Sequence, residues 1–220
     1  MIHEIVLKQV PGSADCRGDR QACCQAVLDA FPPVSCRIES GKVYGLISDF
    51  GCGSWALANC LGGRGETNRG GQAYRNGEPV NLHALAADSA FLPEPVIAGV
   101  NTPDRLGTAR SCIETALACS GMPYTAEQLR QIFSLSTARF DRPLQETSGE
   151  IWLISLAIQF ALGKDLFCLP WLSARTIFRA KVMAELGILD TLRKAGKIVL
   201  LPTNQKATAR RICDRLILLS

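Results

Sequence analysis

The chain has 220 residues, of which 47% are hydrophobic and 20% are charged. This balance is typical of a globular protein with enough apolar material for one large domain. The formal charge of +4 is small and the 24 Lys and Arg residues are spread along the chain, which argues against a nucleic-acid-binding protein. The longest apolar run, residues 151–162, is shorter than the ~20 residues that a membrane-spanning helix needs.

Ten cysteines are a large number for a chain of this length. The chain begins Met-Ile-His-Glu-Ile, which is not a secretory signal, so a disulfide framework is not expected. A zinc site is not expected either, because the sequence has no Cys-x-x-Cys pair and its two histidines are isolated. We therefore expect most of the cysteines to be small buried residues, with Cys52 as the candidate exception because it lies in a glycine-rich loop.

The first third of the chain is expected to consist of strands separated by polar, glycine-containing segments. Apolar alternation predicts a strand over residues 2–10, and the polar residues, glycines and proline pair of 11–33 predict a loop with one helical turn. Further strands are predicted over 34–38 and 42–47, and an apolar helix over 55–61.

The remaining two thirds alternate helices and strands. Glycines in residues 64–81 predict hairpin turns, above all at Asn76-Gly77. Helical spacing predicts two helices within 107–133, with Thr125 as the N-cap of the second. The other predicted elements are a buried strand over 90–92, a long helix after Ser148, buried parallel strands over 166–169 and 198–201, a helix over 206–211 and a last strand over 216–219. This order predicts an α/β fold with a helical lobe at about residues 100–148.

Residues 42–63 have the layout of a phosphate-binding P-loop: a strand, an eight-residue loop with two glycines, and a helix. Such a loop needs glycines so that backbone N–H groups can surround phosphates, a Lys for the phosphate charge, and a Ser or Thr to bind magnesium. Gly51 and Gly53 stand at glycine positions, but Ser54 replaces the Lys and Trp55 replaces the magnesium ligand.

Two further loop residues argue against phosphate binding. Ser48 stands at the first glycine position, and Asp49 adds a carboxylate where phosphate charges would lie. The complete candidate loop is Ser48, Asp49, Phe50, Gly51, Cys52, Gly53, Ser54 and Trp55. Taken alone, this segment favours a structural strand–loop–helix turn over a nucleotide site.

Six segments, in order along nearly the whole chain, resemble the nucleotide-binding domains of ATP-binding-cassette (ABC) transporters. They are residues 39–47 before the P-loop, 91–94 at the Q-loop, 146–157 at the family signature, 163–172 at the Walker B strand, 196–205 at the switch-histidine strand, and 209–220 at the strand after it. Each segment is a weak signal alone, but six in register indicate the family.

The resemblance also shows which functional residues of the family are replaced. The Walker B aspartate falls on Pro170, the catalytic glutamate on Trp171, the switch histidine on Asn204, and the Q-loop glutamine on Glu94. Phosphoryl transfer depends on positioning and on neutralising the developing charge. We therefore expect ATP hydrolysis to be absent or strongly impaired; ATP stays a candidate ligand, and magnesium or another metal is not expected.

The candidate signature loop consists of Thr147, Ser148, Gly149 and Glu150. In the family this loop contacts the γ-phosphate held by the partner's P-loop, and the hydroxyls, the small residues and the helix N-terminus here suit that role. The alternative is a capping box, with Thr147 as N-cap and Glu150 at the third helical position. Both interpretations stay open.

The resemblance implies a P-loop NTPase-type α/β core with a mostly parallel sheet, an N-terminal antiparallel β subdomain and a small helical subdomain. It implies one domain over 1–220, with its core in 1–99 and 149–220 and the helical subdomain at about 100–148. It further implies a cytoplasmic subunit at the inner face of the cell membrane, partnered by a second nucleotide-binding subunit, identical or different, and by a transmembrane subunit. No nucleic-acid partner is expected.

Two other functions stay open. The chain could be a soluble regulatory or scaffold protein on the ABC fold, or an unconventional ATPase that recruits Arg64 or Glu94. We also expect Trp55 and Trp171 to fill the space of magnesium and water, and to meet in an apolar plug.

Overall fold

The computed structural model describes residues 1–15, 28–67, 71–92, 107–147 and 150–219. They form two units, one of Met1–Phe91 with Asp165–Ser220, the other of Leu92–Lys164. The limits expected from the sequence, at about residues 100 and 148, differ from these and stay a prediction.

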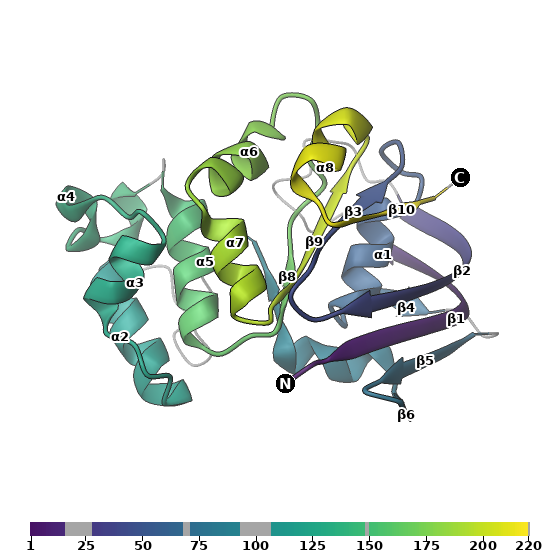
Figure 1. The fold of residues 1–220 in the computed structure, drawn as a ribbon, viewed down its shortest axis with the longest axis horizontal. Coiled ribbons are helices and arrows are strands. Elements are labelled where there is room, and N and C mark those ends of the chain that lie inside the picture. The colour runs from purple at the N-terminus through teal and green to yellow at the C-terminus, as the bar shows by residue number, and fades with distance from the viewer. Residues whose placement is uncertain (16–27, 68–70, 93–106, 148–149, 220) are drawn as a thin grey trace. The chain divides into compact units, whose positions relative to one another are not determined.

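The first unit contains an antiparallel sheet with the strand order β2-β1-β5-β6, in which β4 also pairs with β1 (Figure 1). The strands are β1 (Glu4–Asp15), β2 (Leu28–Glu39), β4 (Glu66–Thr67), β5 (Gln72–Arg75) and β6 (Glu78–Pro79). Asn76-Gly77 turns β5 into β6, with both residues at positive φ, so this predicted hairpin is confirmed.

The loop predicted over residues 11–33 is wrong in its described parts. β1 continues to Asp15 and β2 begins at Leu28, and the two strands pair along their whole length. The polar composition was misleading because β2 is an edge strand, where one row of N–H groups needs no ladder partner and the Pro32-Pro33 pair is tolerated. The register shifts around Gln9 and Val10, where Gln9 has a φ of 52°, also obscure the alternation of apolar residues.

The same unit contains a parallel sheet with the order β10-β3-β9-β8-β7. Its strands are β3 (Val43–Ile47), β7 (Ser89–Phe91), β8 (Leu166–Cys168), β9 (Ile198–Thr203) and β10 (Arg215–Leu218). All residues of β3, β8 and β9 are buried, as their near-continuous apolar sequence predicts for central parallel strands. The expected strands at 42–47, 90–92, 166–169, 198–201 and 216–219 are thus confirmed to within a few residues.

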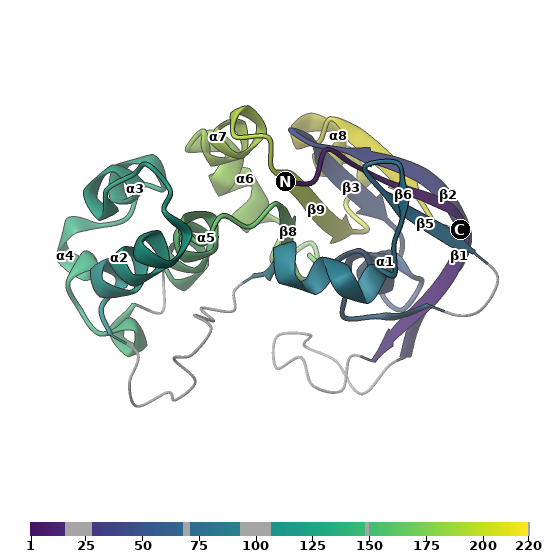
Figure 2. The ribbon, with the colours of Figure 1, turned by 90° about the horizontal axis from the view of Figure 1, so that it is seen from below.

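Helix α1 (Ser54–Leu61) lies in the core that the two sheets of this unit share. All eight of its residues are buried, and it contacts β1 and β2 of one sheet and β3 and β9 of the other. Figure 2 shows these strands from below. The other helices in the described residues of this unit are the 3-10 helix η2 (Leu82–Asp88), α6 (Phe178–Glu185), α7 (Ile188–Lys194) and α8 (Lys206–Ile212).

The second unit is helical, with α2 (Ala109–Ser120), α3 (Ala126–Ile132), α4 (Thr137–Phe140), the 3-10 turn η4 (Leu144–Glu146) and α5 (Ile151–Ala161). Aromatic rings pack at its centre, where Phe160 of α5 makes edge contacts with Tyr124 and Phe133. Thr125 caps α3 in a capping box with Gln128, so its predicted role as N-cap is confirmed.

Two features of the described residues bear on the expectations from composition. None of their helices is long and apolar enough to cross a membrane. The seven cysteines among them are free thiols; Cys60, Cys112 and Cys168 are buried, whereas Cys52 and Cys119 are exposed. Burial raises the pKa of the Cys60 and Cys168 thiols to about 12 each, so these two behave as small core residues.

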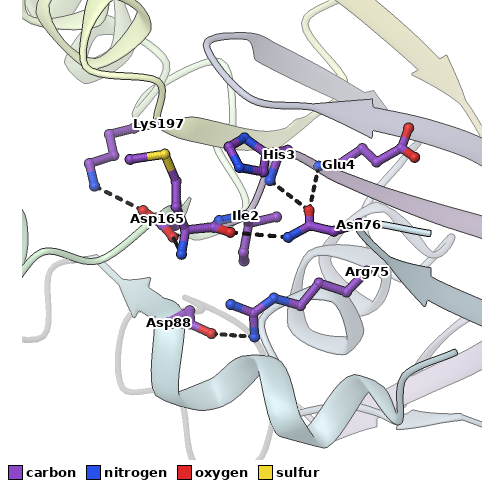
Figure 3. Close-up of polar contacts among 9 residues, drawn as sticks. Ile2, His3, Glu4, Arg75, Asn76, Asp88, Asp165 and Lys197 are labelled. Atoms are coloured by element: carbon purple, nitrogen blue, oxygen red, sulfur yellow. Dashed lines mark hydrogen bonds and ion pairs between the residues drawn. The ribbon is translucent and has the colours of Figure 1, made fainter. Parts of the chain in front are cut away.

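A buried ion pair lies at the amino ends of β8 and β9 (Figure 3). Asp165 precedes β8, Lys197 precedes β9, and the Lys197 Nζ donates to Asp165 Oδ1 at 2.9 Å. The other carboxylate oxygen accepts from the backbone N–H of Ile2 at 2.8 Å, which attaches the start of β1 to the parallel sheet. Burial raises the pKa of Asp165, but the hydrogen bond and charge of Lys197, the Ile2 N–H and the N-terminal ammonium together bring it below its ordinary value.

Candidate functional site

Three segments that the sequence predicts as functional meet at the carboxyl edge of the parallel sheet. The loop after β3 begins with Ser48, whose N–H donates to the Thr203 carbonyl at the end of β9 (3.3 Å). The segment after β8 is tied to the same strand, because Leu172 N–H donates to Pro202 and the Thr203 hydroxyl donates to the Leu172 carbonyl at 2.6 Å. Ligand sites of open parallel sheets lie at this edge.

The glycine loop is closed by its own hydrogen bonds. The Ser48 hydroxyl accepts from the Ser54 N–H at 3.0 Å and donates to the Asp49 carbonyl at 2.9 Å. The Cys52 N–H donates to the same carbonyl at 3.1 Å, which makes a tight turn. Gly53 has a φ of 100°, a conformation that favours glycine. Ser48, which the sequence predicts at the first glycine position of a P-loop, therefore stabilises the loop through its own hydrogen bonds.

Asp29 of β2, which sequence analysis missed, caps the helix that follows the loop. Its Oδ1 accepts from the Gly53 N–H at 2.6 Å and its Oδ2 from the Ala56 N–H at 2.7 Å. The side chain is buried, with 2% of the residue exposed. A single Asp within residues 11–33, which the sequence predicts as a polar loop, gives no sign of a functional role. Only the pairing of β2 with β1 brings Asp29 next to the glycine loop that follows β3.

The surroundings of Asp29 explain how a carboxylate can be buried there. Burial raises its pKa above the ordinary value, and the N–H groups of Ala56, Gly53, Trp55 and Ala30 oppose that rise without cancelling it. The N-terminus of a helix attracts negative charge, and the first turn of α1 contains no acidic residue of its own. Asp29 therefore supplies from β2 the anionic cap that α1 lacks.

The first turn of α1 is apolar and enclosed. Ser54 is 1% exposed, and its hydroxyl oxygen has no hydrogen-bond partner within the described structure. Trp55 is also buried and belongs to the hydrophobic core of the unit. The residues that the sequence predicts at the Lys and magnesium-ligand positions of a P-loop are therefore a small buried hydroxyl and a core indole.

The segment after β8 places an aromatic ring against the loop. The Trp171 ring packs edge-on against Phe50, with 5.1 Å between the ring centroids. Trp171 also packs against the core cluster that contains Trp55, and its indole N–H has no partner among the described residues. The expected apolar filling around Trp171 thus involves Phe50, and direct ring contact between Trp55 and Trp171 stays a prediction.

The chain is similar to several ABC ATP-binding proteins. The nitrate import ATP-binding protein NrtD of Synechococcus elongatus is 21% identical over 208 residues, which are 94% of this chain and 75% of NrtD. The structure of cbiO1 from Clostridium perfringens, described as part of the ABC transporter complex cbiONQ, matches with a TM-score of 0.64 at 11% identity, over 100% of this chain and 86% of that one. The dimeric structure of MJ0796, a bacterial ABC transporter cassette, matches with a TM-score of 0.65 at 16% identity, over 98% and 94% of the two chains. No protein-family model matches the chain.

The chain has the ABC ATPase fold. The proteins that it matches are ABC ATP-binding proteins, so the predicted resemblance and the predicted α/β fold are confirmed, whereas the positions of the single motifs stay predictions.

Three further residues that the sequence predicts as site candidates, Asn204, Pro170 and Arg64, lie in described parts of the first unit. Asn204, which the sequence predicts at the switch-histidine position, is exposed just after β9, and its side-chain oxygen accepts from Gln205 Nε2 at 2.7 Å. Pro170, which the sequence predicts at the Walker B aspartate position, is half-buried just after β8. The guanidinium of Arg64 lies over the Phe91 ring, 3.8 Å from its centroid. Glu94 lies outside the described residues.

Two residues of the predicted signature loop, Thr147 and Glu150, are described in the second unit, and their contacts show that the capping-box alternative is wrong. Glu150 is itself the N-cap residue of α5 and makes no side-chain cap. Its carboxylate instead accepts from the Ser136 N–H at 3.1 Å and pairs with Arg139. Thr147 is completely buried, and its hydroxyl donates to the Leu144 carbonyl at 2.7 Å. Ser148 and Gly149 lie outside the described residues.

The described part of the chain contains no cluster of side chains that could form a metal site. No group of three or more His, Cys, Asp or Glu side chains gathers there in a way that could hold a metal ion. The two carboxylates nearest the loop have different surroundings, since Asp29 is buried against backbone N–H groups and Asp49 is exposed.

Proposed function

We propose that the chain is a nucleotide-binding-type subunit of an ABC membrane transporter that does not hydrolyse ATP in its own P-loop. Its relative NrtD is named as an ATP-binding protein of nitrate import, and cbiO1 is described as part of a transporter complex. An intact ABC subunit would supply the catalytic groups, and a transmembrane subunit would form the path for cargo. The chain would then work at the inner face of the cell membrane.

The observation that carries the proposal is the composition of the carboxyl edge of the parallel sheet. Ser54 and Trp55 stand where the phosphate-binding Lys and the magnesium ligand would be, and Pro170 and Trp171 stand where the two Walker B acids would be. Asn204 stands at the switch histidine. Phosphoryl transfer relies on these groups to position the nucleotide, bind magnesium and orient water. Replacement of all five removes nearly every group that performs these tasks in the family.

The residues present also fit MgATP poorly. Magnesium bound to a nucleotide needs carboxylate or hydroxyl oxygen ligands, and the hydroxyl of Ser54 lies in the buried first turn of α1. Phosphate needs cations or free N–H groups, whereas the N–H groups of Gly53 and Ala56 are already bound to Asp29. For this reason the proposal includes no catalytic step at this loop.

The chain's role in a transporter would then be to complete a dimer. MJ0796 is described as dimeric, and the family's signature loop acts on the nucleotide of the partner subunit. A homodimer of this chain would contain two P-loops without the catalytic groups. A transporter role therefore requires a different, intact ABC subunit as the partner.

A second candidate, a regulatory or scaffold protein on the ABC fold, is favoured by one observation. The Thr147 hydroxyl, the first group of the signature loop, is completely buried and is bound to the Leu144 carbonyl. A group held inside its own unit in this way is not presented to a nucleotide across a dimer.

Co-expression with any intact ABC subunit and any multi-span membrane protein that neighbouring genes encode distinguishes the two candidates. The transporter proposal predicts a stable complex whose ATPase activity is lost when the partner's Walker B glutamate is replaced and is unchanged when Asn204 of this chain is replaced by Ala. Purification of the chain without those subunits favours the scaffold. ATP turnover by the purified chain alone, dependent on magnesium, would overturn both.

A further inference from the structure

The carboxylate of Asp29 accepts hydrogen bonds from backbone N–H groups of the kind with which a P-loop binds phosphate. Such loops bind phosphate through the backbone N–H groups of the last glycine and of the first helical turn. Here these donors include Gly53 and Ala56, which donate to the two oxygens of Asp29 at 2.6 Å and 2.7 Å. Both oxygens of one carboxylate are thus engaged by groups that a phosphate would need.

The position of Asp29 is fixed by the strand that carries it. Asp29 pairs with Ala14 of β1 within the long β1–β2 ladder, and 2% of the residue is exposed. The ladder lies close to the loop: a Cβ added to Gly53 would come within 2.6 Å of the Phe31 Cβ. A Cβ added to Gly12 would come within 2.7 Å of the Phe31 ring. The carboxylate is therefore held against the loop by backbone packing and not by a flexible side chain alone.

The charge of Asp29 is matched by backbone dipoles. Within the described part of the chain no Lys or Arg forms an ion pair with it, and its partners are N–H groups of the loop and of the first turn of α1. The first turn of α1 has no acidic residue, and its N-cap Gly53 has no side chain to cap it. The helix N-terminus thus needs an anion, and Asp29 is the anion that the chain supplies.

We propose that Asp29 is an internal ligand of the P-loop, which it occupies in place of nucleotide phosphate and thereby closes. A phosphate entering this loop must displace a buried carboxylate or lie beside its negative charge, and both are unfavourable. The inference rests on the proposed function in taking residues 48–55 as the counterpart of the ABC P-loop. The replaced motif residues alone would not block the loop, whereas the Asp29 carboxylate would. Substitution of Asp29 should therefore restore part of the phosphate binding.

The test measures the effect of inorganic pyrophosphate on the thermal unfolding of the full chain, against sodium chloride at equal ionic strength. Three proteins are compared: the wild type, Asp29→Ala, and Glu78→Ala, which removes an exposed carboxylate of β6 in the same unit. We expect pyrophosphate to raise the Tm of Asp29→Ala and to leave the other two unchanged. The apparent Kd for pyrophosphate should fall at least about 10-fold relative to the wild type, because a like charge is removed and two N–H donors are freed.

Equal stabilisation of the wild type and Asp29→Ala by pyrophosphate would overturn the proposal, as would no stabilisation of either. If Asp29→Ala does not fold in chloride, its refolding from urea in pyrophosphate is compared with that in chloride, and recovery in pyrophosphate alone supports the proposal. Asp29→Asn, which keeps the shape of the side chain, is then titrated as well; no gain in pyrophosphate affinity by either variant would overturn the proposal. None of these measurements uses a partner subunit or ATP turnover, so a failure here is distinct from a failure of the proposed transporter role.

Discussion

Two buried carboxylates lie at opposite edges of the same parallel sheet, and their partners differ. Asp165, at the amino edge, is bound by the Lys197 ammonium and the Ile2 N–H (Figure 3). Asp29, at the carboxyl edge, is bound by the N–H groups of Gly53 and Ala56. A full opposite charge lowers the pKa of the first below its ordinary value, whereas burial raises the pKa of the second despite its N–H donors.

The difference separates a structural acid from one that occupies a binding site. At the amino edge, charge matches charge, and the pair joins β8, β9 and the start of β1. At the carboxyl edge, backbone dipoles arranged for an external anion hold a carboxylate of the chain itself. If this is correct, substitution of Asp165 should damage the fold most, whereas substitution of Asp29 should change which anions bind.

The largest effect is expected for Asp165→Asn. It leaves the Lys197 ammonium buried without its opposite charge, and breaking a buried pair in this way costs about 3–5 kcal/mol. The matched control is Asp88→Asn, which breaks the pair of Asp88 with Arg75; both of these side chains are about 30% exposed. That control should cost no more than about 1 kcal/mol, as measured by urea unfolding.

A double variant sharpens this result. In Asp165→Asn combined with Lys197→Met, neither charge is buried, so we expect much of the lost free energy of unfolding to return. A loss for Asp165→Asn no larger than that for Asp88→Asn would contradict the assignment of Asp165 as a structural acid.

The pH dependence of stability should have opposite signs at the two acids. The pKa of Asp165 is lower in the folded chain than in the unfolded chain, so its contribution is complete above the unfolded pKa of about 3.9 and is lost as the pH falls through the folded pKa. The pKa of Asp29 is raised on folding, so the folded chain binds its proton more readily, and stability rises as the pH falls from neutral through that raised pKa.

Urea midpoints between pH 7 and pH 3.5 test both signs when the wild type is compared with Asp29→Asn and Asp165→Asn. Relative to Asp29→Asn, the wild type should gain stability as the pH falls, by about 1.4 kcal/mol for each unit of difference in the pKa of Asp29. Relative to Asp165→Asn, it should lose stability below about pH 4. If the wild type changed in stability in the same direction relative to both variants as the pH falls, Asp29 and Asp165 would not differ in the sign of their pKa shifts.

Sequence reasoning predicted the parts of this molecule that depend on local pattern. The apolar runs of β3, β8 and β9, the hairpin at Asn76-Gly77 and the cap at Thr125 all follow from periodicity or turn chemistry. The motif order also identified the positions that meet at the carboxyl edge. Local pattern could not reveal the role of Asp29, because it depends on pairing between distant strands, and the polar edge strand β2 resembles a loop in sequence. The role of Glu150 was also missed, because its partners Ser136 and Arg139 lie at α4, in another part of the chain.

The smallest expected effect concerns the ring pair beside the loop. Phe50 and Trp171 pack edge-on at 5.1 Å, at the carboxyl edge where Asp29 closes the loop. A double-mutant cycle of Phe50→Ala and Trp171→Ala, measured by urea unfolding, should give a coupling free energy of about 0.5–1.5 kcal/mol. The matched cycle pairs Phe50→Ala with Phe133→Ala, whose ring packs in the second unit, and it should give a coupling near zero. A coupling near zero for Phe50 and Trp171 would mean that Trp171, the residue predicted at the catalytic-glutamate position, does not hold the loop, and that closure depends on Asp29 alone.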